Sequence, residues 1–107
     1  MKIGKRFVDN VSPVLIVAEI GVNHDGSLDR ALELVKIARQ CGADAVKLQI
    51  FQADRLMHKS SQFAQYQKQT VIDADPTAML RRFELSQSQL KTIVKAIDAA
   101  GMIAVAT

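Results

Sequence analysis

The chain has 107 residues, of which 49% are hydrophobic and 23% are charged, a composition typical of one globular domain. Its net charge of +3 comes from scattered basic residues and is accompanied by only five aromatic side chains, which argues against a nucleic-acid surface but suits an anionic small substrate. One cysteine, Cys41, excludes a disulfide framework and a thiolate metal site. We interpret it as a small residue at a helix end, with a reactive thiol as the alternative.

The N-terminal segment, MKIGKRFVDN, is basic but lacks the apolar core of a signal peptide. No apolar run approaches the roughly 18 residues that a membrane span needs. Together with the single cysteine, these features predict a cytoplasmic protein without a membrane partner.

The first half of the chain carries the signals of a βαβ unit. Pro13 opens an apolar run, residues 14 to 18 or 19, that predicts a strand, and Ser27 stands where a helix N-cap would. Apolar residues with a helical period then lead to Gly42, in the position of a C′ glycine, before a second strand over 45–50. Two strands joined by one helix in this way are expected to be parallel.

The second half begins with a long polar stretch, 52–75, which has no clean period and is therefore expected to be a functional loop. Pro76 stands at the first position of a short helix. Ser86 and Gln89 then form the pattern of a capping box at the start of a longer helix. Residues 102–107 predict a third strand.

The element order, β-α-β-loop-α-β, predicts an α/β fold, the N-terminal portion of a TIM (β/α)8 barrel with about three parallel strands. Three strands cannot close a barrel that needs eight. We therefore expect residues 1–107 to be the incomplete N-terminal part of a longer barrel domain.

The second strand divides into two faces, because side chains alternate along a strand. One face holds Val46, Leu48 and Ile50 and is expected to pack on helices. The other face holds Lys47 and Gln49 and is expected to point into the barrel near its C-terminal rim. A lysine in a barrel interior is costly unless it has a partner.

Glu19 is the candidate partner, because it ends the neighbouring strand at the same rim. The sequence thus predicts a site in which the carboxylate of Glu19, the ammonium of Lys47 and the amide of Gln49 converge, at the end of the barrel where such folds carry out chemistry. The alternative is a buried Glu19–Lys47 ion pair kept for structure, although such pairs are weak evidence for stability.

Two polar residues, Asn23 and His24, fall in the first βα loop at this rim. Each has a simpler interpretation, turn formation for Asn23 and solvation for His24, beside a role in the site. His24 has no second histidine nearby that would make it a metal ligand, and His58 is expected to be solvated. The acidic run over 73–76 is expected to start a helix rather than to bind a metal.

Four segments resemble those of one enzyme family. AEIGVNHDG, GADAVKLQIF, FELS and GMIAVAT match, in order and spacing from about Val14 to Thr107, the N-terminal part of the sialic acid synthase family, the N-acetylneuraminate synthases and their spore-coat and legionaminate relatives. The resemblance implies a TIM-barrel synthase domain. In longer members it is followed by a C-terminal antifreeze-like domain, which is absent from this sequence.

The resemblance also implies an activity. Family members condense phosphoenolpyruvate with an N-acetylhexosamine, such as N-acetylmannosamine, to give a nine-carbon 2-keto sugar acid and phosphate. A divalent metal, Mn²⁺ or Mg²⁺, is expected to assist, and a homodimer is expected for the full-length enzyme.

Four residues at strand ends match site residues of the family. Glu19 matches the family glutamate near the sugar aldehyde and the reacting carbon. Lys47 matches the lysine at the phosphoenolpyruvate end, with Gln49 as the glutamine beside it. Thr107 matches the threonine that closes the third strand and contacts phosphoenolpyruvate.

Three loop residues complete the implied site. Asn23 and His24 match a family asparagine and histidine without separately assigned roles, and Tyr66 matches a tyrosine over the sugar pocket. The family's metal-binding histidines come from later strands, so the resemblance assigns no metal ligand to this chain. We therefore expect the isolated chain to be inactive.

Two other interpretations remain open at this point. One is a Schiff-base aldolase barrel in which Lys47 is the nucleophile. The other is a truncated product without catalytic activity, in which an open sheet edge would favour aggregation.

Overall fold

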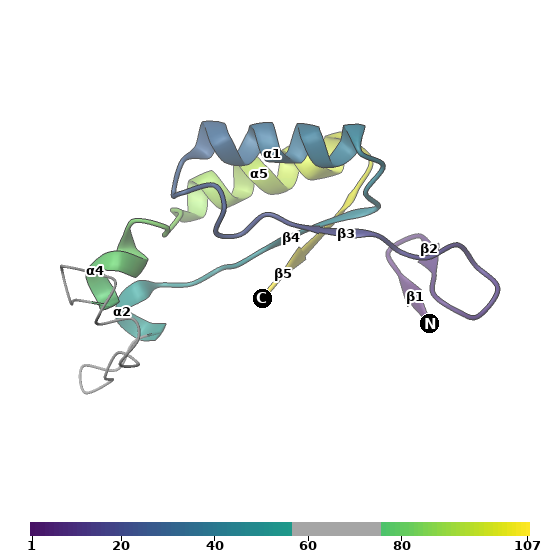
Figure 1. Ribbon diagram of the computed structural model, residues 1–107, viewed down its shortest axis with the longest axis horizontal. Helices are drawn as coiled ribbons and strands as arrows, with labels where there is room; N and C mark the ends of the chain where they lie inside the picture. The colour runs from purple at the N-terminus through teal and green to yellow at the C-terminus, as the bar shows by residue number, and fades with distance from the viewer. Residues whose placement is uncertain (57–75) are drawn as a thin grey trace.

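The computed structural model describes residues 1–56 and 76–107. Its main feature is a parallel three-stranded sheet in the order β3 (Val17–Glu19), β4 (Ala45–Leu48) and β5 (Ile103–Ala106). Two long helices, α1 (Leu28–Gln40) and α5 (Gln87–Ala99), lie side by side on one face of this sheet (Figure 1). The α/β class and the parallel pairing are therefore confirmed.

The strand register places Glu19 and Lys47 side by side on one face of the sheet. Glu19 of β3, Lys47 of β4 and Val105 of β5 lie level with one another across the sheet. Since side chains alternate along each strand, this row points away from Val46 and Leu48, which are buried under the helices. The predicted division of β4 into two faces is confirmed for the residues of the strand.

Local signals in the sequence determine where α1 begins and ends. The Ser27 side chain accepts a hydrogen bond from the Arg30 N–H at 3.2 Å, which satisfies one of the free donors of the first turn. The helix ends with Cys41 at its C-cap and with Gly42 at a φ of +84°, a backbone conformation that glycine adopts without strain. The cap and the C′ glycine were both predicted, and the helix-end interpretation of Cys41 is confirmed.

The start of α5 is a reciprocal capping box, as predicted. The Ser86 hydroxyl accepts from the Gln89 N–H at 3.2 Å, and the Gln89 side chain accepts from the Ser86 N–H at 2.9 Å. The helix is followed by Gly101, whose φ of +77° closes the last turn before β5.

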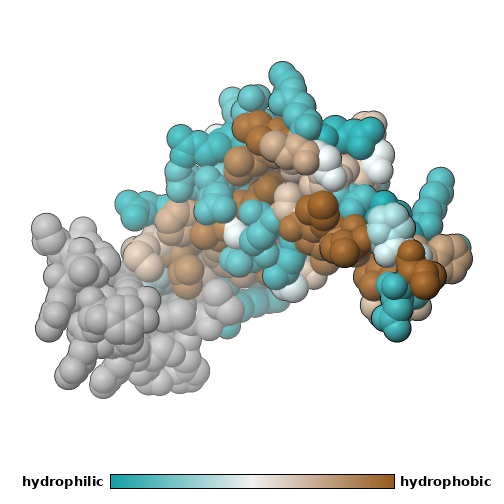
Figure 2. Space-filling view, turned by 45° about the vertical axis from the view of Figure 1, so that its right-hand side comes forward, coloured by the Kyte–Doolittle hydropathy of each residue, from teal (hydrophilic) through white to brown (hydrophobic). Residues whose placement is uncertain are grey.

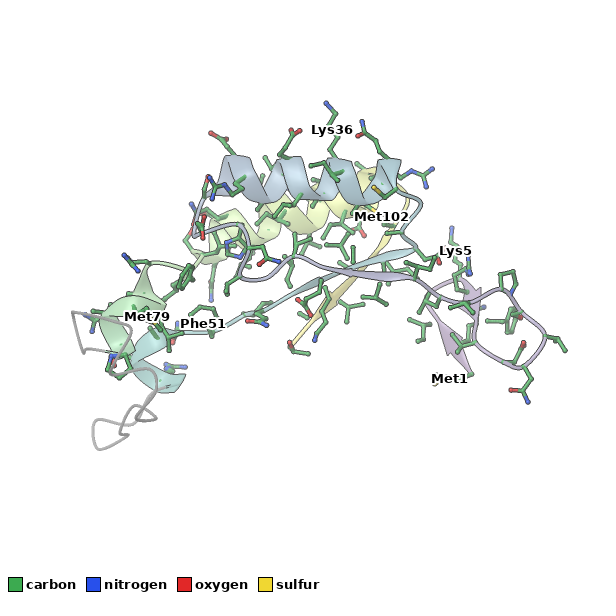
Figure 3. The ribbon with its side chains drawn as sticks, in the orientation of Figure 1. Met1, Lys5, Lys36, Phe51, Met79 and Met102 are labelled. Carbon is green, nitrogen blue, oxygen red and sulfur yellow. The ribbon has the colours of Figure 1, made fainter. Side chains whose placement is uncertain are left out.

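The hydrophobic core lies between the two helices and the sheet. Burying one large apolar side chain contributes about 1.5–3 kcal/mol, so this layer supplies most of the stabilisation of the described fold. Figure 3 shows Met102 in this layer and Lys36 on the side of α1 that points away from the molecule. The buried side chains of this layer include Ala31 and Val35 of α1, Ile93 and Ile97 of α5, and Val46 and Leu48 of β4.

A short antiparallel hairpin at the N-terminus was not predicted. Strands β1 (Lys2–Ile3) and β2 (Arg6–Phe7) are joined by a two-residue turn in which Gly4 has a φ of +58°. The strands are too short to show a sequence period. The hairpin contributes exposed apolar side chains, Phe7 among them, on a side of the molecule where Figure 2 shows hydrophobic surface.

An ion pair attaches the hairpin to the amino end of the sheet. The Arg6 guanidinium donates to the Asp44 carboxylate at 2.7 Å and also to the carbonyl oxygens of Pro13 and Val14, at 3.3 and 3.4 Å. The second oxygen of Asp44 accepts from the Ile16 N–H at 2.9 Å. These contacts hold residues 13–16 against the amino end of the sheet, where the Ile16 carbonyl also accepts from the Ala45 N–H of β4 at 3.1 Å.

The first predicted strand is therefore too long at its start. It begins at Val17 and not directly after Pro13, and Val14 is 80% exposed. The second predicted strand is too long at its end, because β4 stops at Leu48. Ile50, which we expected on the helix-packed face, is instead 50% exposed.

Two short helices lie beyond the carboxyl ends of the strands (Figure 1). The first, α2 (Ala53–Leu56), is a helical turn inside the stretch predicted as a loop. The second, α4 (Pro76–Arg81), begins at the predicted proline. Arg81 forms an ion pair with Asp54, which joins α4 to α2. In the ranges 1–56 and 76–107 we find no helix with both the length and the apolar content needed to cross a membrane.

Candidate functional site

Two opposite charges meet at the carboxyl end of the sheet. Lys47 Nζ lies 2.9 Å from Oε2 of Glu19, on the face that α1 and α5 leave uncovered. The Lys47 side chain is 33% exposed and the Glu19 side chain 42%. The predicted convergence of these two residues at one rim is confirmed. In the described residues the pair is open to solvent on one side, and the alternative of a buried ion pair kept for structure stays untested.

Gln49 is held one step further along the same rim. Gly21 lies so close that a Cβ atom on it would stand 2.6 Å from the Gln49 backbone nitrogen. On the other side, Thr107 bonds to the end of β4 and to the segment after it: its N–H donates to the Leu48 carbonyl at 3.0 Å, and its carbonyl accepts from the Ile50 N–H at 2.7 Å. Gln49 and Thr107 are both exposed.

Gly21 is a site residue that the sequence interpretation missed. Its lack of a side chain lets the first βα loop lie against the end of β4, so it determines how close the loop comes to Gln49. The available signal was a glycine two residues after the charged residue that ends the strand.

The first βα loop, residues 20–27, is ordered by its own hydrogen bonds. The Asn23 N–H donates to the Ile20 carbonyl at 2.9 Å, and the Ser27 N–H donates to the His24 carbonyl at 2.9 Å. The Gly26 N–H donates to Nδ1 of His24 at 3.0 Å. Asn23 is exposed, and its role in the site stays a prediction.

His24 is buried, so the simpler of its two interpretations, a solvated loop residue, is wrong. Its exposed fraction is 1%, and among the described residues Nε2 has no hydrogen-bond partner. Burial lowers the pKa of His24 below the ordinary histidine value, and the neighbouring Asp25 carboxylate opposes that change. The imidazole is therefore neutral at neutral pH.

Two hollows of the described surface lie away from the charged pair. A hollow of about 320 Å³ lies between the segment after β4 and the start of α5, where the Glu84 carboxylate accepts from the Ala53 N–H at 3.2 Å. Another, of about 590 Å³, lies against the hairpin and is lined in part by Arg6 and Asp44. The pair itself lies on an open sheet face.

The described residues do not fit a divalent cation. No three His, Cys, Asp or Glu side chains within 1–56 and 76–107 come together to hold a metal ion. His24, the histidine of the rim loop, uses Nδ1 for the Gly26 N–H. Tyr66, His58 and most of the acidic run over 73–76 lie outside the described residues, so their predicted roles stay predictions.

The fold and the rim together define a class of protein. Parallel strands with helices on their outer face and polar side chains at their carboxyl ends are the arrangement of α/β barrel enzymes. The spore coat polysaccharide biosynthesis protein SpsE of Bacillus subtilis superimposes over 99% of this chain with a TM-score of 0.69 at 29% identity. The N-acetylneuraminic acid (sialic acid) synthetase of Leptospira borgpetersenii, solved in complex with citrate, superimposes over 99% with a TM-score of 0.79 at 20% identity, which is a likeness of fold. The described strands and helices are part of such a barrel.

The chain belongs to the NeuB family, whose family model matches residues 34–107. It is 52% identical to SpsE of Bacillus subtilis over 58 residues and 48% identical to an N,N'-diacetyllegionaminic acid synthase of Legionella pneumophila over 73 residues. These matches cover 54% and 67% of this chain, but 16% and 20% of the two relatives. The resemblance to the sialic acid synthase family is therefore confirmed, for a chain that spans a fifth or less of these relatives' length.

Proposed function

We propose that this chain supplies the phosphoenolpyruvate-binding rim of a sugar acid synthase. The reaction condenses phosphoenolpyruvate with an N-acetylhexosamine of the N-acetylmannosamine type, giving a nine-carbon 2-keto sugar acid and phosphate. Membership of the NeuB family supports sugar acid synthesis in general. The observation that carries the finer proposal is the Lys47–Glu19 contact of 2.9 Å on the uncovered face of the sheet.

Lys47 provides the cation that this substrate needs. Phosphoenolpyruvate carries a phosphate and a carboxylate, and an ammonium held at the end of the sheet offsets their charge. Gln49 and Thr107 lie next along the same rim and supply hydrogen-bonding groups to the anion. The three residues come from β4 and β5 or the positions directly after them, so the sheet fixes their spacing.

Glu19 lies on the other side of Lys47 from Thr107, because β3 and β5 flank β4. Its carboxylate orients the sugar or moves a proton while the new bond forms. Asn23, exposed in the loop that follows Glu19, contributes an amide to the sugar. Tyr66 is proposed to cover the sugar, although it lies outside the described residues.

The reaction balances without an oxidant or reductant. The methylene carbon of phosphoenolpyruvate forms a bond to the aldehyde carbon, and the aldehyde oxygen takes up a proton to become a hydroxyl. Water adds to the carbon that bears the phosphate, and the bond from this carbon to the phosphate oxygen breaks, which leaves the keto group and releases phosphate. The divalent metal implied by the resemblance finds no ligand set in the described residues, so no step is assigned to it here.

Removing the Lys47 ammonium tests the proposal. In the full polypeptide that carries these residues, Lys47→Ala should lower kcat/KM for phosphoenolpyruvate by about 100-fold or more, as loss of one preorganised charge partner does in other enzymes. The matched control is Lys36→Ala, because Lys36 points away from the molecule on α1 (Figure 3) and should leave the kinetics unchanged. Unchanged kinetics for Lys47→Ala would remove this residue from the site.

The aldolase interpretation makes a different prediction for the same residue. A Schiff-base nucleophile needs a free amine, whereas Lys47 is engaged in an ion pair with Glu19. Borohydride treatment in the presence of a keto acid should therefore trap no adduct on Lys47. A covalent adduct there would favour the aldolase over the synthase.

A further inference from the structure

We propose that His24 is a positioning residue of the synthase, whose neutral imidazole holds the first βα loop in place by accepting the Gly26 N–H. The loop carries Asn23 at the rim, so this proposal rests on the proposed function for its kinetic consequences. Its structural part stands on the geometry of residues 20–27.

The bond from the Gly26 N–H to Nδ1 of His24, at 3.0 Å, joins a side chain of the loop to the loop's own backbone. The side chains of Asp25 and Ser27 bond instead to Arg30 of α1, and the remaining printed bonds of 20–27 join backbone groups, so the bond to His24 is the one that holds the Gly26 N–H. The geometry resembles an Asx turn, in which a side-chain acceptor takes the N–H two residues later. An asparagine in place of His24 could accept the same N–H.

Gly26 is also the point where the loop meets the segment after α4. Its φ is +72°, and a Cβ atom on it would overlap the Arg82 carbonyl oxygen. By fixing Gly26, His24 therefore fixes the loop against the residues that lead into α5. The same bond sets the path of the chain back to Asn23, three residues earlier.

The protonation state of His24 decides whether the bond exists. With Nδ1 as acceptor, the neutral ring carries its proton on Nε2. A second proton would turn Nδ1 into a donor facing another donor, and it would place a charge on a side chain that is 1% exposed. The loop is thus held while His24 is neutral and released when it is protonated.

The neighbouring charges do not reverse this behaviour. Asp25, next in the chain, favours the charged imidazole, but burial has the larger effect on the pKa of His24 and lowers it. The Asp25 carboxylate is itself paired with Arg30 of α1. On the facing segment, Arg82 is exposed and presents its carbonyl to Gly26, and Glu84 accepts from the Ala53 N–H. In the sheet, Lys47 and Glu19 pair with each other.

Two substitutions in the full polypeptide separate the acceptor from the bulk of the ring. His24→Asn keeps an acceptor for Gly26 and should leave kcat/KM for the amino sugar close to wild type at neutral pH. His24→Leu keeps apolar volume without an acceptor and should lower kcat/KM by about tenfold, with the loss mainly in the KM of the sugar. Equal activity of His24→Leu and wild type would overturn the proposal, and so would equal losses in both variants.

The dependence of activity on pH tests the role of His24 as an acceptor, because a residue that only fills space would not change that dependence. The wild-type protein should lose activity as the pH falls through the lowered pKa of His24. His24→Asn should not show this loss. Titration of the substrate affects both proteins equally, so the difference between the two profiles reports on His24. Identical profiles would contradict the proposal. This comparison decides the question even where His24→Leu fails to fold.

A spectroscopic measurement distinguishes failure of the inference from failure of the proposed function. Nitrogen NMR of the His24 ring should show an unprotonated, hydrogen-bonded Nδ1 and a protonated Nε2 at neutral pH. A protonated Nδ1 overturns the positioning role whatever the activity. If the wild-type protein shows this tautomer but does not condense phosphoenolpyruvate with an amino sugar, the loop structure is supported and the proposed function is refuted.

Discussion

Gly26 shows how much of the rim depends on one missing side chain. Its positive φ and its contact with the Arg82 carbonyl are two separate reasons for glycine at this position. Gly101 shares the positive φ, +77°, but a Cβ atom there would have nothing within 4 Å. The two glycines thus form a natural pair for separating backbone strain from collision.

We expect Gly101→Ala to lower the free energy of unfolding by about 1 kcal/mol, the cost of forcing a left-handed conformation on alanine. Gly26→Ala should cost about 3 kcal/mol, because displacement of the facing backbone adds to that strain. Urea unfolding of the full polypeptide measures both. Equal losses would mean that the Arg82 segment yields freely and does not hold the loop.

The burial of His24 could not be predicted from the sequence, because it depends on contacts with distant residues. Histidine between asparagine and aspartate has the local character of a solvated turn. What encloses it is the packing of the loop on distant parts of the chain, and no periodic pattern in 20–27 encodes that packing. By contrast, Glu19 and Lys47 could be placed together in advance, because strand alternation and parallel pairing are general rules.

Individual elements were predicted best where one residue acts locally. Ser27 and Ser86 cap helices through bonds that span three residues, and both caps are present. The strand start was misplaced because the Ile16 N–H donates to the side chain of Asp44, 28 residues away, although the Ile16 carbonyl still accepts from the Ala45 N–H of β4. The N-terminal hairpin was missed because strands of two residues show no alternation.

Asp44 is the residue on which the attachment of the hairpin depends. It accepts from Arg6 at 2.7 Å and from the Ile16 N–H at 2.9 Å. Asp44→Ala should therefore lower the free energy of unfolding by about 2 kcal/mol, since it leaves both donors without their acceptor. Arg6→Ala should cost less, about 1 kcal/mol, because the bond to Ile16 survives and the pair is partly exposed.

Adding both changes in one protein completes a double-mutant cycle. The combined loss should be smaller than the sum of the two single losses, because Arg6 and Asp44 lose the same bond. Strict additivity, measured by urea unfolding, would mean that the two side chains act independently. Activity should change little, because this contact lies at the amino end of the strands, away from the rim.

On the scale of the whole molecule, the sheet is covered by helices on one face only within the described residues. Val17 on the open face is 43% exposed, and β3 and β5 are the edges of the described sheet. Exposed apolar strands with unpaired edges favour association with further strands. A polypeptide limited to residues 1–107 should therefore self-associate.

Light scattering across a dilution series measures this association. Val17→Lys should shift the population toward monomer, because it places a charge on the open face. Ile37→Lys is the matched control, since Ile37 is equally exposed, 43%, but lies on α1. A monomer at every concentration with one cooperative unfolding transition would contradict the expectation, and equal effects of both substitutions would show that the open face is not the contact.

The Lys47–Glu19 contact makes anion binding an exchange and not a simple addition. A phosphate or carboxylate that binds Lys47 must compete with the Glu19 carboxylate, which already lies 2.9 Å from the ammonium. Because the pair is open to solvent, added salt screens both the Lys47–Glu19 attraction and the attraction between Lys47 and the bound anion. Affinity for an anion at this rim should consequently vary less with ionic strength than it would at a lone lysine, and replacing Glu19 by glutamine should steepen that dependence.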